Sequence, residues 1–346
     1  MAKELDKNAD ITLAALGTVA DCLPLIGDNR NIVVQGLKEI NKSPNMAIQK
    51  IMEVANINKN ILTAYDLGYV IGPRINATGR ISDPTDSLRL LCSDDATNAL
   101  KYANILNTNN AKRQELQSQA IDECLPKSVT KDKLLFFADT KYLPGIIGLI
   151  AGKLTEKNYK PSIIISIDKD ISKGSCRSIE ELNIIEALKQ HQDLLLDVGG
   201  HKLAAGFSIA TKNIKKFQKA ITKTVEKLLK DKILIPKNNI DAQIESAAVT
   251  IKNINAINLL EPFGVGNPKP IFLLKNVIIK SLRTVGSTKD HLQLKLDDSL
   301  SAIAFKQGKL EKHLKIGQSI DILANLDINI WGNTQTPQLV IKEFYL

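Results

Sequence analysis

The sequence predicts an α/β fold followed by a region of β-strands, and three observations lead to this prediction. Strand-like runs at 133–138 and 162–167 flank a helical segment at 146–154, an order typical of an α/β layer. After residue 239 the pattern changes to short runs of alternating apolar and polar residues, which indicates a small β-barrel or sandwich. The 346 residues exceed what one hydrophobic core normally supports, so we expect two or three domains.

The N-terminal part of the chain is predicted to be largely helical. The segment 11–20 is almost continuously apolar, as a buried strand or helix would be, and it ends at Asp21. Helical spacing follows at 29–71. We expect 72–80 to interrupt it as a loop, because these nine residues hold two glycines, a proline, two arginines and an asparagine. A polar-faced helix at 85–124 would suit a connector between domains.

The composition favours an intracellular protein with a polyanionic partner. The net charge is +9, with 46 basic against 37 acidic residues, although a lysine-biased proteome explains this charge equally well. The cysteines are Cys22, Cys92, Cys124 and Cys176. They form no C-x-x-C pair, so they indicate neither a zinc site nor a disulfide framework. No apolar run reaches about 18 residues and no signal-peptide core stands at the N-terminus, so we expect a cytoplasmic protein without a membrane span.

Asp21 is the first candidate functional residue. It closes the segment 17–21, which reads Gly-Thr-Val-Ala-Asp. A carboxylate at the C-terminal end of a strand is where α/β folds place metal ligands. An aspartate in this position is more often a helix cap or a turn residue, and the residues alone favour that interpretation.

Arg74 and Arg80 form the second candidate, with Asn76 between them. Guanidinium groups on a glycine-containing loop suit bidentate recognition of phosphate. The alternative is a loop held by ion pairs to the nearby Asp83 and Asp86. The spacing leaves both interpretations open.

Two glycine-containing segments of the second domain are further candidates. The segment 174–178 reads Gly-Ser-Cys-Arg-Ser and is expected just after a strand, where backbone N–H groups and hydroxyls could approach an oxyanion. A plain turn would have the same composition. The paired glycines of 199–206 predict a close-approach turn that could open a helix toward phosphate. His201 within it is by default a capping or packed histidine.

A loop rich in proline and glycine is expected to lead into the β-rich part. It spans 262–268 and reads Pro-Phe-Gly-Val-Gly-Asn-Pro, a composition that marks a fixed, structural loop. The aromatic residues beyond it are a thin set for stacking bases: Phe305, Trp331 and Tyr345.

The order of these segments resembles that of the RecJ-type exonucleases, members of the DHH family that degrade single-stranded DNA from the 5′ end. The segment 17–21 is similar to the family's last metal-ligand motif and 72–77 to its arginine loop. The segments 174–178 and 199–201 are similar to the substrate motifs of its DHHA1 domain, and 262–268 to the entry of its OB-fold. Five ordered motifs are far more specific than any one of them.

The resemblance implies a fold of class α/β plus β in four parts. These are the remnant of a DHH domain at 1–95, a connecting helix at 96–127, a DHHA1 α/β domain at 128–235 and an OB-like β-barrel at 236–346.

The resemblance also implies roles for individual residues. Asp21 would bind catalytic Mn²⁺ or Mg²⁺, while Arg74 near the scissile phosphate and His201 would be catalytic. Ser175 and Arg177 would hold the 5′-terminal phosphate. The other substrate-binding residues would be Asn76, Arg80, Ser178, Gly199 and Gly200.

The sequence departs from the family in its metal ligands. No Asp-His-His triplet occurs, and one carboxylate cannot hold two hard cations that each require several oxygen ligands. A smaller departure is Leu143, where the family usually has histidine. We therefore expect a RecJ-type polypeptide that is inactive alone, as a split-gene product or as a subunit that needs a separate N-terminal half.

Other functions stay open. One alternative is a non-catalytic module that binds single-stranded nucleic acid. A phosphodiesterase acting on small nucleotides is the other, and the β-rich region argues against it, because such enzymes need no added strand-binding domain. Single-stranded DNA is the expected partner, with single-strand-binding protein or a helicase as further candidates.

Overall fold

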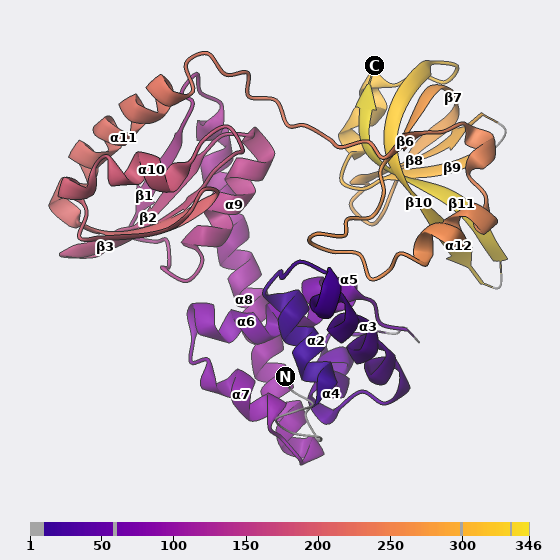
Figure 1. Cartoon of the computed structure of the whole chain (residues 1–346), viewed down its shortest axis with the longest axis horizontal. Helices are drawn as coiled ribbons and strands as arrows, with labels where there is room; N and C mark the ends of the chain where they lie inside the picture. The colour runs from indigo at the N-terminus through magenta and orange to yellow at the C-terminus, as the bar shows by residue number, and fades with distance from the viewer. Residues whose placement is uncertain (1–9, 58–60, 298–299, 333, 346) are drawn as a thin grey trace. The chain divides into compact units, whose positions relative to one another are not determined.

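The computed structural model describes residues 10–57, 61–297, 300–332 and 334–345 (Figure 1). They divide into two compact units. The first unit takes its residues from 1–38, 63–65 and 237–346, and the second from 39–62 and 66–236. Within the described residues, no helix combines the length and the apolar character that a membrane span requires.

The N-terminal segment 11–20, expected as a strand or a helix, is helix α2 (Ile11–Ala20). Asp10 caps it by accepting a hydrogen bond from the Thr12 N–H at 2.8 Å. Asp21 is its C-cap, so this carboxylate follows a helix and not a strand. Helix α3 (Gly27–Lys42) follows. A small apolar cluster packs α2 against its surroundings, and its buried members are Ala15, Leu25, Val33 and Ala64.

The loop at 262–268 packs on the turn between α2 and α3, within the first unit. The Leu25 N–H donates to the Val265 carbonyl at 2.6 Å, and Arg30 Nη2 donates to the Glu261 carbonyl at 2.7 Å. A Cβ atom on Gly264 would lie only 2.6 Å from Leu25 Cδ1. A side chain at residue 264 would therefore force the buried Leu25 side chain to shift. The contacts hold the loop in place as its composition predicts.

The short helix α5 (Ala64–Asp66) has its first two residues in the first unit. The helices of the second unit that come next along the chain pack on one long helix, α8 (Ala96–Ser128). Those in contact with α8 are α4 (Met46–Val54), α6 (Gly72–Ile81) and α7 (Thr85–Leu91), and the π-helix η1 (Leu67–Ile71) precedes α6. The helix expected at 85–124 is thus broken between α7 and α8, and α8 begins where the Asp95 side chain accepts from the Asn98 N–H.

The prediction of a loop at 72–80 is wrong, because this segment is helix α6. Pro73 stands in its first turn, where the missing N–H costs little. The preceding turn is a π-helix, in which the Gly72 N–H bonds to the Leu67 carbonyl. Ala77 and Thr78 are fully buried. Tertiary packing here outweighs the low helix propensity of glycine and proline.

The α/β part of the second unit is a five-stranded sheet in the order β1-β2-β3-β5-β4. Strands β1 (Leu135–Asp139) and β2 (Ser162–Ser166) are parallel and joined through α9 (Ile147–Asn158), as the strand–helix–strand pattern predicts. The other strands are antiparallel: β3 (Ile171–Arg177), β4 (Asp197–His201) and β5 (Ala204–Ala210). Helices α10 (Ile184–Lys189) and α11 (Ile214–Leu228) complete it.

The two glycine-containing segments lie largely in strands. The plain turn considered for 174–178 is not formed, and the turn expected within 199–206 lies at 202–203, where it joins two strands and does not open a helix. Residues 174–177 lie in β3 and 199–201 end β4. Gly174 pairs with Phe207 of β5, whose ring Cζ lies 2.1 Å from where a Cβ on Gly174 would be. Glycine in a strand often marks such a close approach, and this partner is distant in sequence.

The sheet is covered on both faces. On one face Cys176 of β3 and Phe207 of β5 pack with Phe217 of α11. On the other, Ile164 of β2 packs with Ile150 of α9 and with residues of α8. Ser175 and Arg177 alternate with Cys176 and so belong to the face that α9 only partly covers.

The C-terminal part of the first unit is a closed β-barrel. Its strands are β7 (Phe272–Val285), β8 (His291–Leu296), β9 (Leu300–Ala304), β10 (Ser319–Trp331) and β11 (Thr334–Tyr345). They pair in the order β10-β11-β9-β8-β7, and β10 also pairs with β7, which closes the barrel. The short strand β6 (Ala242–Gln243) and helix α12 (Ile251–Asn258) precede it. The predicted barrel is confirmed, although the strands expected at 271–274 and 277–282 are one continuous strand.

The close approach of Gly174 to Phe207 leads to a stability prediction. Gly174→Ala is expected to lower the free energy of unfolding by about 1–3 kcal/mol, because the new methyl group would overlap a buried ring. Gly199→Ala, where nothing lies within 4 Å of the new atom, is expected to change it by less than about 0.5 kcal/mol. Urea unfolding of both variants measures the difference. Equal midpoints would contradict this account of the strand.

Candidate phosphate-binding site

A cavity of about 530 Å³ lies in the second unit, between the C-terminal end of α6, the start of α9 and one face of the sheet. Glycines line much of it: Gly79, Gly145, Gly148, Gly174 and Gly206. Its charged and hydroxyl-bearing side chains are Arg80, Lys173, Ser175, Arg177, Asp197 and Ser208. A site with this lining combines several donors with a backbone that a ligand can approach closely.

The register of three strands arranges the sheet side of the cavity. Lys173, Ser175 and Arg177 point to the same face of β3, because side chains alternate along a strand. Each of these residues pairs with a residue of β5, which in turn pairs with a residue of β4, so the three strands form rows across the sheet. Lys173 is in a row with Ser208 and Asp197, and Ser175 with Gly206 and Gly199. The third row contains Arg177, Ala204 and His201. His201 therefore lies on the face of Arg177, two strands or about 10 Å away.

Two glycines bring the helices to this face. A Cβ on Gly145 would lie 1.9 Å from the Arg80 carbonyl oxygen, so only glycine permits the contact, and Arg80 Nη1 donates to the Gly145 carbonyl at 3.2 Å. A Cβ on Gly148 would lie 3.1 Å from Ser175 Oγ and 3.3 Å from Arg177 Nη2. Ile147 and Gly148 are the first residues of α9 and both line the cavity. The positive end of this helix dipole therefore adds to the positive charge of the site.

Three arginines interact across this region. Burial lowers the pKa of Arg80, and the charge of Arg177 lowers it further. Burial likewise lowers the pKa of Arg113 on α8, with a smaller contribution from the charge of Arg80. Each pair of like charges raises the cost of keeping both groups ionised, and a bound anion would relieve this repulsion.

Neutral acceptors hold these guanidinium groups. Arg113 donates to Asn110 Oδ1 at 2.6 Å and to Gln117 Oε1 at 2.9 Å. Arg177 Nη1 donates to the Cys176 carbonyl at 2.9 Å and lies 3.4 Å from Ser175 Oγ. In the described part of the chain, none of the three forms an ion pair with a carboxylate. Their charge is thus left for a ligand.

Apart from Asp21, six of the predicted site residues do not line the cavity: Arg74, Asn76, Ser178, Gly199, Gly200 and His201. Arg74 Nε donates to Asn107 Oδ1 at 3.0 Å and its Nη1 to the Val70 carbonyl at 2.8 Å, so it joins α6 to α8. Burial lowers its pKa. Asn76 is exposed on α6, and Ser178 Oγ donates to the Leu182 carbonyl at 2.9 Å.

The alternative ion pairs at α6 are not formed among the residues that the structure describes. Asp83 accepts from the N–H and the hydroxyl of Thr85, and Asp86 pairs with Arg89 at 3.1 Å. The hydrogen bonds from Thr85 lower the pKa of Asp83.

Asp21 belongs to the first unit and is exposed. Across the described ranges, no group of three or more His, Cys, Asp or Glu side chains is placed to hold a metal ion. Mn²⁺ and Mg²⁺ require several oxygen ligands, so the described residues do not fit the cation that the resemblance implies.

Several residues of this site escaped the sequence analysis. Lys173 stands two positions before Ser175, and side chains two positions apart lie on the same face of a strand. Recognising 171–177 as a strand would therefore have added Lys173 to the candidate site. Ser208, Asp197 and Gly148 have no local signal, because pairing between distant strands and packing of α9 bring them to the cavity.

The comparisons with known proteins agree with this architecture. A family model described as DHHA1 domain matches residues 131–227, and one described as RecJ OB domain matches residues 240–343. The chain belongs to the RecJ family. The fold is therefore of class α/β plus β, with a DHHA1 domain followed by an OB domain.

Curated relatives bear the same family name. The single-stranded-DNA-specific exonuclease RecJ of Bacillus subtilis is 30% identical over 96% of this chain and 43% of its own length. That of Haemophilus influenzae is 31% identical over 96% of this chain and 60% of its own length. The chain thus spans about half the length of these relatives.

A solved structure extends the likeness to three dimensions. RecJ from Thermus thermophilus in complex with Mg²⁺ has a TM-score of 0.85 and 29% identity, and the match covers 97% of this chain and 52% of that one. The Mn²⁺ complex of the same protein gives a TM-score of 0.86 at 28% identity, covering 97% and 49% of the two chains.

The unpaired arginines lead to a prediction about simple anions. Inorganic phosphate is expected to raise the midpoint of thermal unfolding, because an anion that binds only the folded site stabilises it by about 1.4 kcal/mol at ten times its dissociation constant. Arg177→Gln is expected to lose most of this rise. Arg89→Gln, whose guanidinium is exposed and paired with Asp86, is expected to keep it. Potassium chloride at matched ionic strength is the control, and equal rises in both variants would contradict the site.

Proposed function

We propose that this chain binds single-stranded DNA as part of a RecJ-type, metal-dependent 5′–3′ exonuclease and does not cleave DNA by itself. The observation that carries the proposal is the convergence of Arg80, Lys173 and Arg177 on one glycine-lined cavity without ion pairs among the described residues. The relatives named single-stranded-DNA-specific exonuclease support the substrate class.

The chemistry of the cavity suits the 5′-terminal phosphate of a strand. A terminal phosphate carries nearly one more negative charge than an internal diester and offers three strongly accepting oxygens. The Arg177 guanidinium can bind two of them in a fork, while the Ser175 hydroxyl and the start of α9 supply further donors. Gly206 lines the cavity and Gly199 pairs with it on β4, so the sheet has no side chains at these two positions and the sugar-phosphate chain could pass over them.

His201 would act at the β4 edge of this sheet. It ends β4, is exposed, and lies on the same face as Arg177, so its imidazole could donate to a phosphate oxygen further along the strand. Gly200 next to it has a φ of +145°, and a Cβ there would lie 2.4 Å from the Ala204 carbonyl oxygen. Glycine is therefore needed for the turn that presents His201. Roles for Arg74, Asn76 and Ser178 at the substrate stay predictions.

The catalytic step needs residues beyond those described. Two cations would polarise the phosphodiester and activate a water molecule, and Asp21 could supply only one oxygen ligand to them. We infer that the other ligands come from residues outside the described part of the chain. A cytoplasmic location and contacts with single-strand-binding protein or a helicase likewise stay predictions.

The alternative is a module that binds single strands without taking part in cleavage. The described residues contain no carboxylate cluster, and this fits a non-catalytic module as well as it fits part of an exonuclease. An added N-terminal half that restores cleavage would distinguish the exonuclease from this module.

The end-specific pocket leads to a prediction for Arg177. Arg177→Ala is expected to weaken binding of a 5′-phosphorylated oligonucleotide by about ten- to a hundredfold, because a lost charge-assisted hydrogen bond costs about 1.5–3 kcal/mol. The 5′-hydroxyl form of the same strand should bind almost as well as to the wild type. Titrations of both strands at fixed salt measure this. Equal losses would show that Arg177 is a general phosphate contact.

The missing ligands lead to a prediction about catalysis. The purified chain is expected not to shorten end-labelled single-stranded DNA in the presence of Mn²⁺ or Mg²⁺. Shortening that Asp21→Ala abolishes and Asp28→Ala preserves would sink this prediction, since Asp28 is a matched exposed carboxylate at the start of α3. Shortening that survives both substitutions would identify a contaminating nuclease.

A further inference from the structure

Helix α11 of the second unit has two faces of opposite character. Its buried residues pack on the sheet: Ile214, Phe217, Ile221 and Val225. The other face carries a row of exposed lysines at helical spacing, here called the lysine row: Lys215, Lys216, Lys219, Lys223 and Lys227. Since α11 and α9 cover opposite faces of the sheet, the lysine row lies on the far side from the candidate phosphate-binding cavity (Figure 1).

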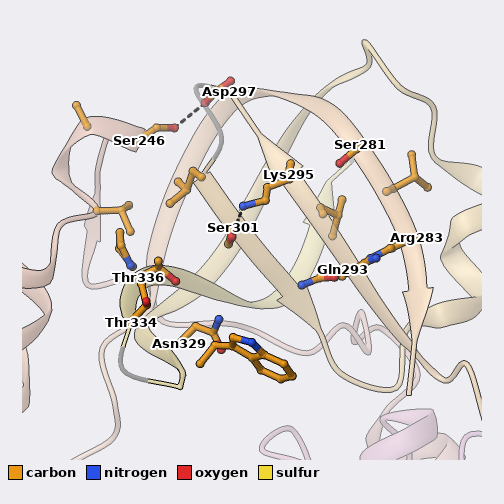
Figure 2. A pocket seen from close by; sticks show the side chains of 17 residues that line it. Ser246, Ser281, Arg283, Gln293, Lys295, Asp297, Ser301, Asn329, Thr334 and Thr336 are labelled. Atoms are coloured by element: carbon orange, nitrogen blue, oxygen red, sulfur yellow. Dashed lines mark hydrogen bonds between the residues drawn. The ribbon is translucent and has the colours of Figure 1, made fainter. Parts of the chain in front are cut away.

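The lysine row has no acidic partner. None of its members forms an ion pair in the described part of the chain, and neither does Glu226, the one carboxylate of α11. Lysines elsewhere do find partners. Lys153 of α9 pairs with Glu156 at 2.8 Å, and in the barrel cavity that Figure 2 shows, Lys295 Nζ donates to Ser301 Oγ at 2.7 Å.

This arrangement opposes folding of the helix. Like charges four residues apart destabilise a helix, and the row contains such pairs in unbroken succession from Lys215 to Lys227. Lys215 and Lys216 also stand in the first turn, where the helix dipole disfavours a cation and no acidic residue balances them. Among the described residues no ion pair offsets this repulsion, whereas a bound polyanion would remove it.

The composition of the lysine row indicates which polyanion it fits. Protein–protein interfaces are depleted in lysine and centre on aromatic or apolar anchors, which the row lacks. Single strands are held by stacking their bases on aromatic rings, and the one ring of α11, that of Phe217, is buried. A duplex keeps its bases inside and presents phosphates, which lysine side chains contact without regard to sequence.

We propose that the lysine row of α11 binds the phosphate backbone of double-stranded DNA. At about 1.5 Å per residue the row is about 18 Å long, and one strand of a duplex presents a phosphate about every 3.4 Å of its axis, so about five phosphates lie alongside it. This inference goes beyond the proposed function, because its ligand is a duplex and its surface is the other face of the domain. A duplex held there keeps the chain beside the single-stranded ends that adjoin it.

The salt dependence of duplex binding tests this proposal. The full chain is titrated with a blunt duplex that has 5′-hydroxyl ends, which offer no terminal phosphate to the cavity. Each phosphate contact contributes about 0.9 to the slope of log K against log salt, so Lys219→Gln/Lys223→Gln is expected to lower the magnitude of this slope by about 1.8. Lys219→Arg/Lys223→Arg keeps both charges and is expected to keep the slope.

The matched control is Lys38→Gln/Lys42→Gln. These exposed lysines of α3 are also four residues apart and form no ion pair among the described residues, so the net charge falls equally. An unchanged slope in the α11 glutamine variant, or an equal fall in the control, would overturn the proposal. Equal loss of affinity for a 5′-hydroxyl single strand would overturn the assignment to a duplex, and competition by polyglutamate as strong as that by duplex would identify an acidic protein as the ligand instead.

Two further measurements separate this proposal from unfolding and from the proposed function. The α11 glutamine variant is expected to unfold thermally at or above the temperature of the wild type, because the substitution relieves repulsion between like charges. A fall in slope is then a loss of binding. The Arg177→Ala titrations depend on the terminal phosphate that this duplex lacks, so either proposal can fail while the other holds.

Discussion

The architecture of the candidate phosphate-binding cavity depends on two contacts in which a glycine admits a group that no other residue would allow. Gly145 lets the start of α9 meet the Arg80 backbone, and Gly174 admits the Phe207 ring into the pairing of β3 with β5. A glycine in a strand costs about 0.5–1 kcal/mol relative to alanine. Burial of a phenylalanine contributes about 1.5–3 kcal/mol, so the packing more than offsets this cost.

These contacts also determine the electrostatics of the cavity. With α6, α9 and β3 held together, Arg80 and Arg177 come close enough for the charge of one to lower the pKa of the other. Like charges at such a distance oppose folding unless another gain compensates, and here hydrogen bonds to neutral acceptors hold the arginine side chains instead of carboxylates. The positive charges of the candidate site are therefore already assembled in the folded chain, as the proposed binding of an anion requires.

The lining of the DHHA1 cavity determines which part of a nucleotide it could contact. It combines guanidinium groups with glycines and has no exposed ring among its described lining residues, which suits phosphate but gives no contact with a base.

Sequence patterns alone determined the succession of a helical region, an α/β layer and a β-barrel, because hydrophobic periodicity is a local property. They also singled out Arg80, Ser175 and Arg177, which the structure brings into one cavity. Only the tertiary structure decided that 72–80 is helical and that 174–177 and 199–201 are strands, since glycine and proline indicate loops unless distant residues pack against them. Lys173, Asp197 and Ser208 joined the site for the same reason: the register between β3, β5 and β4 arises from long-range pairing that no local pattern encodes.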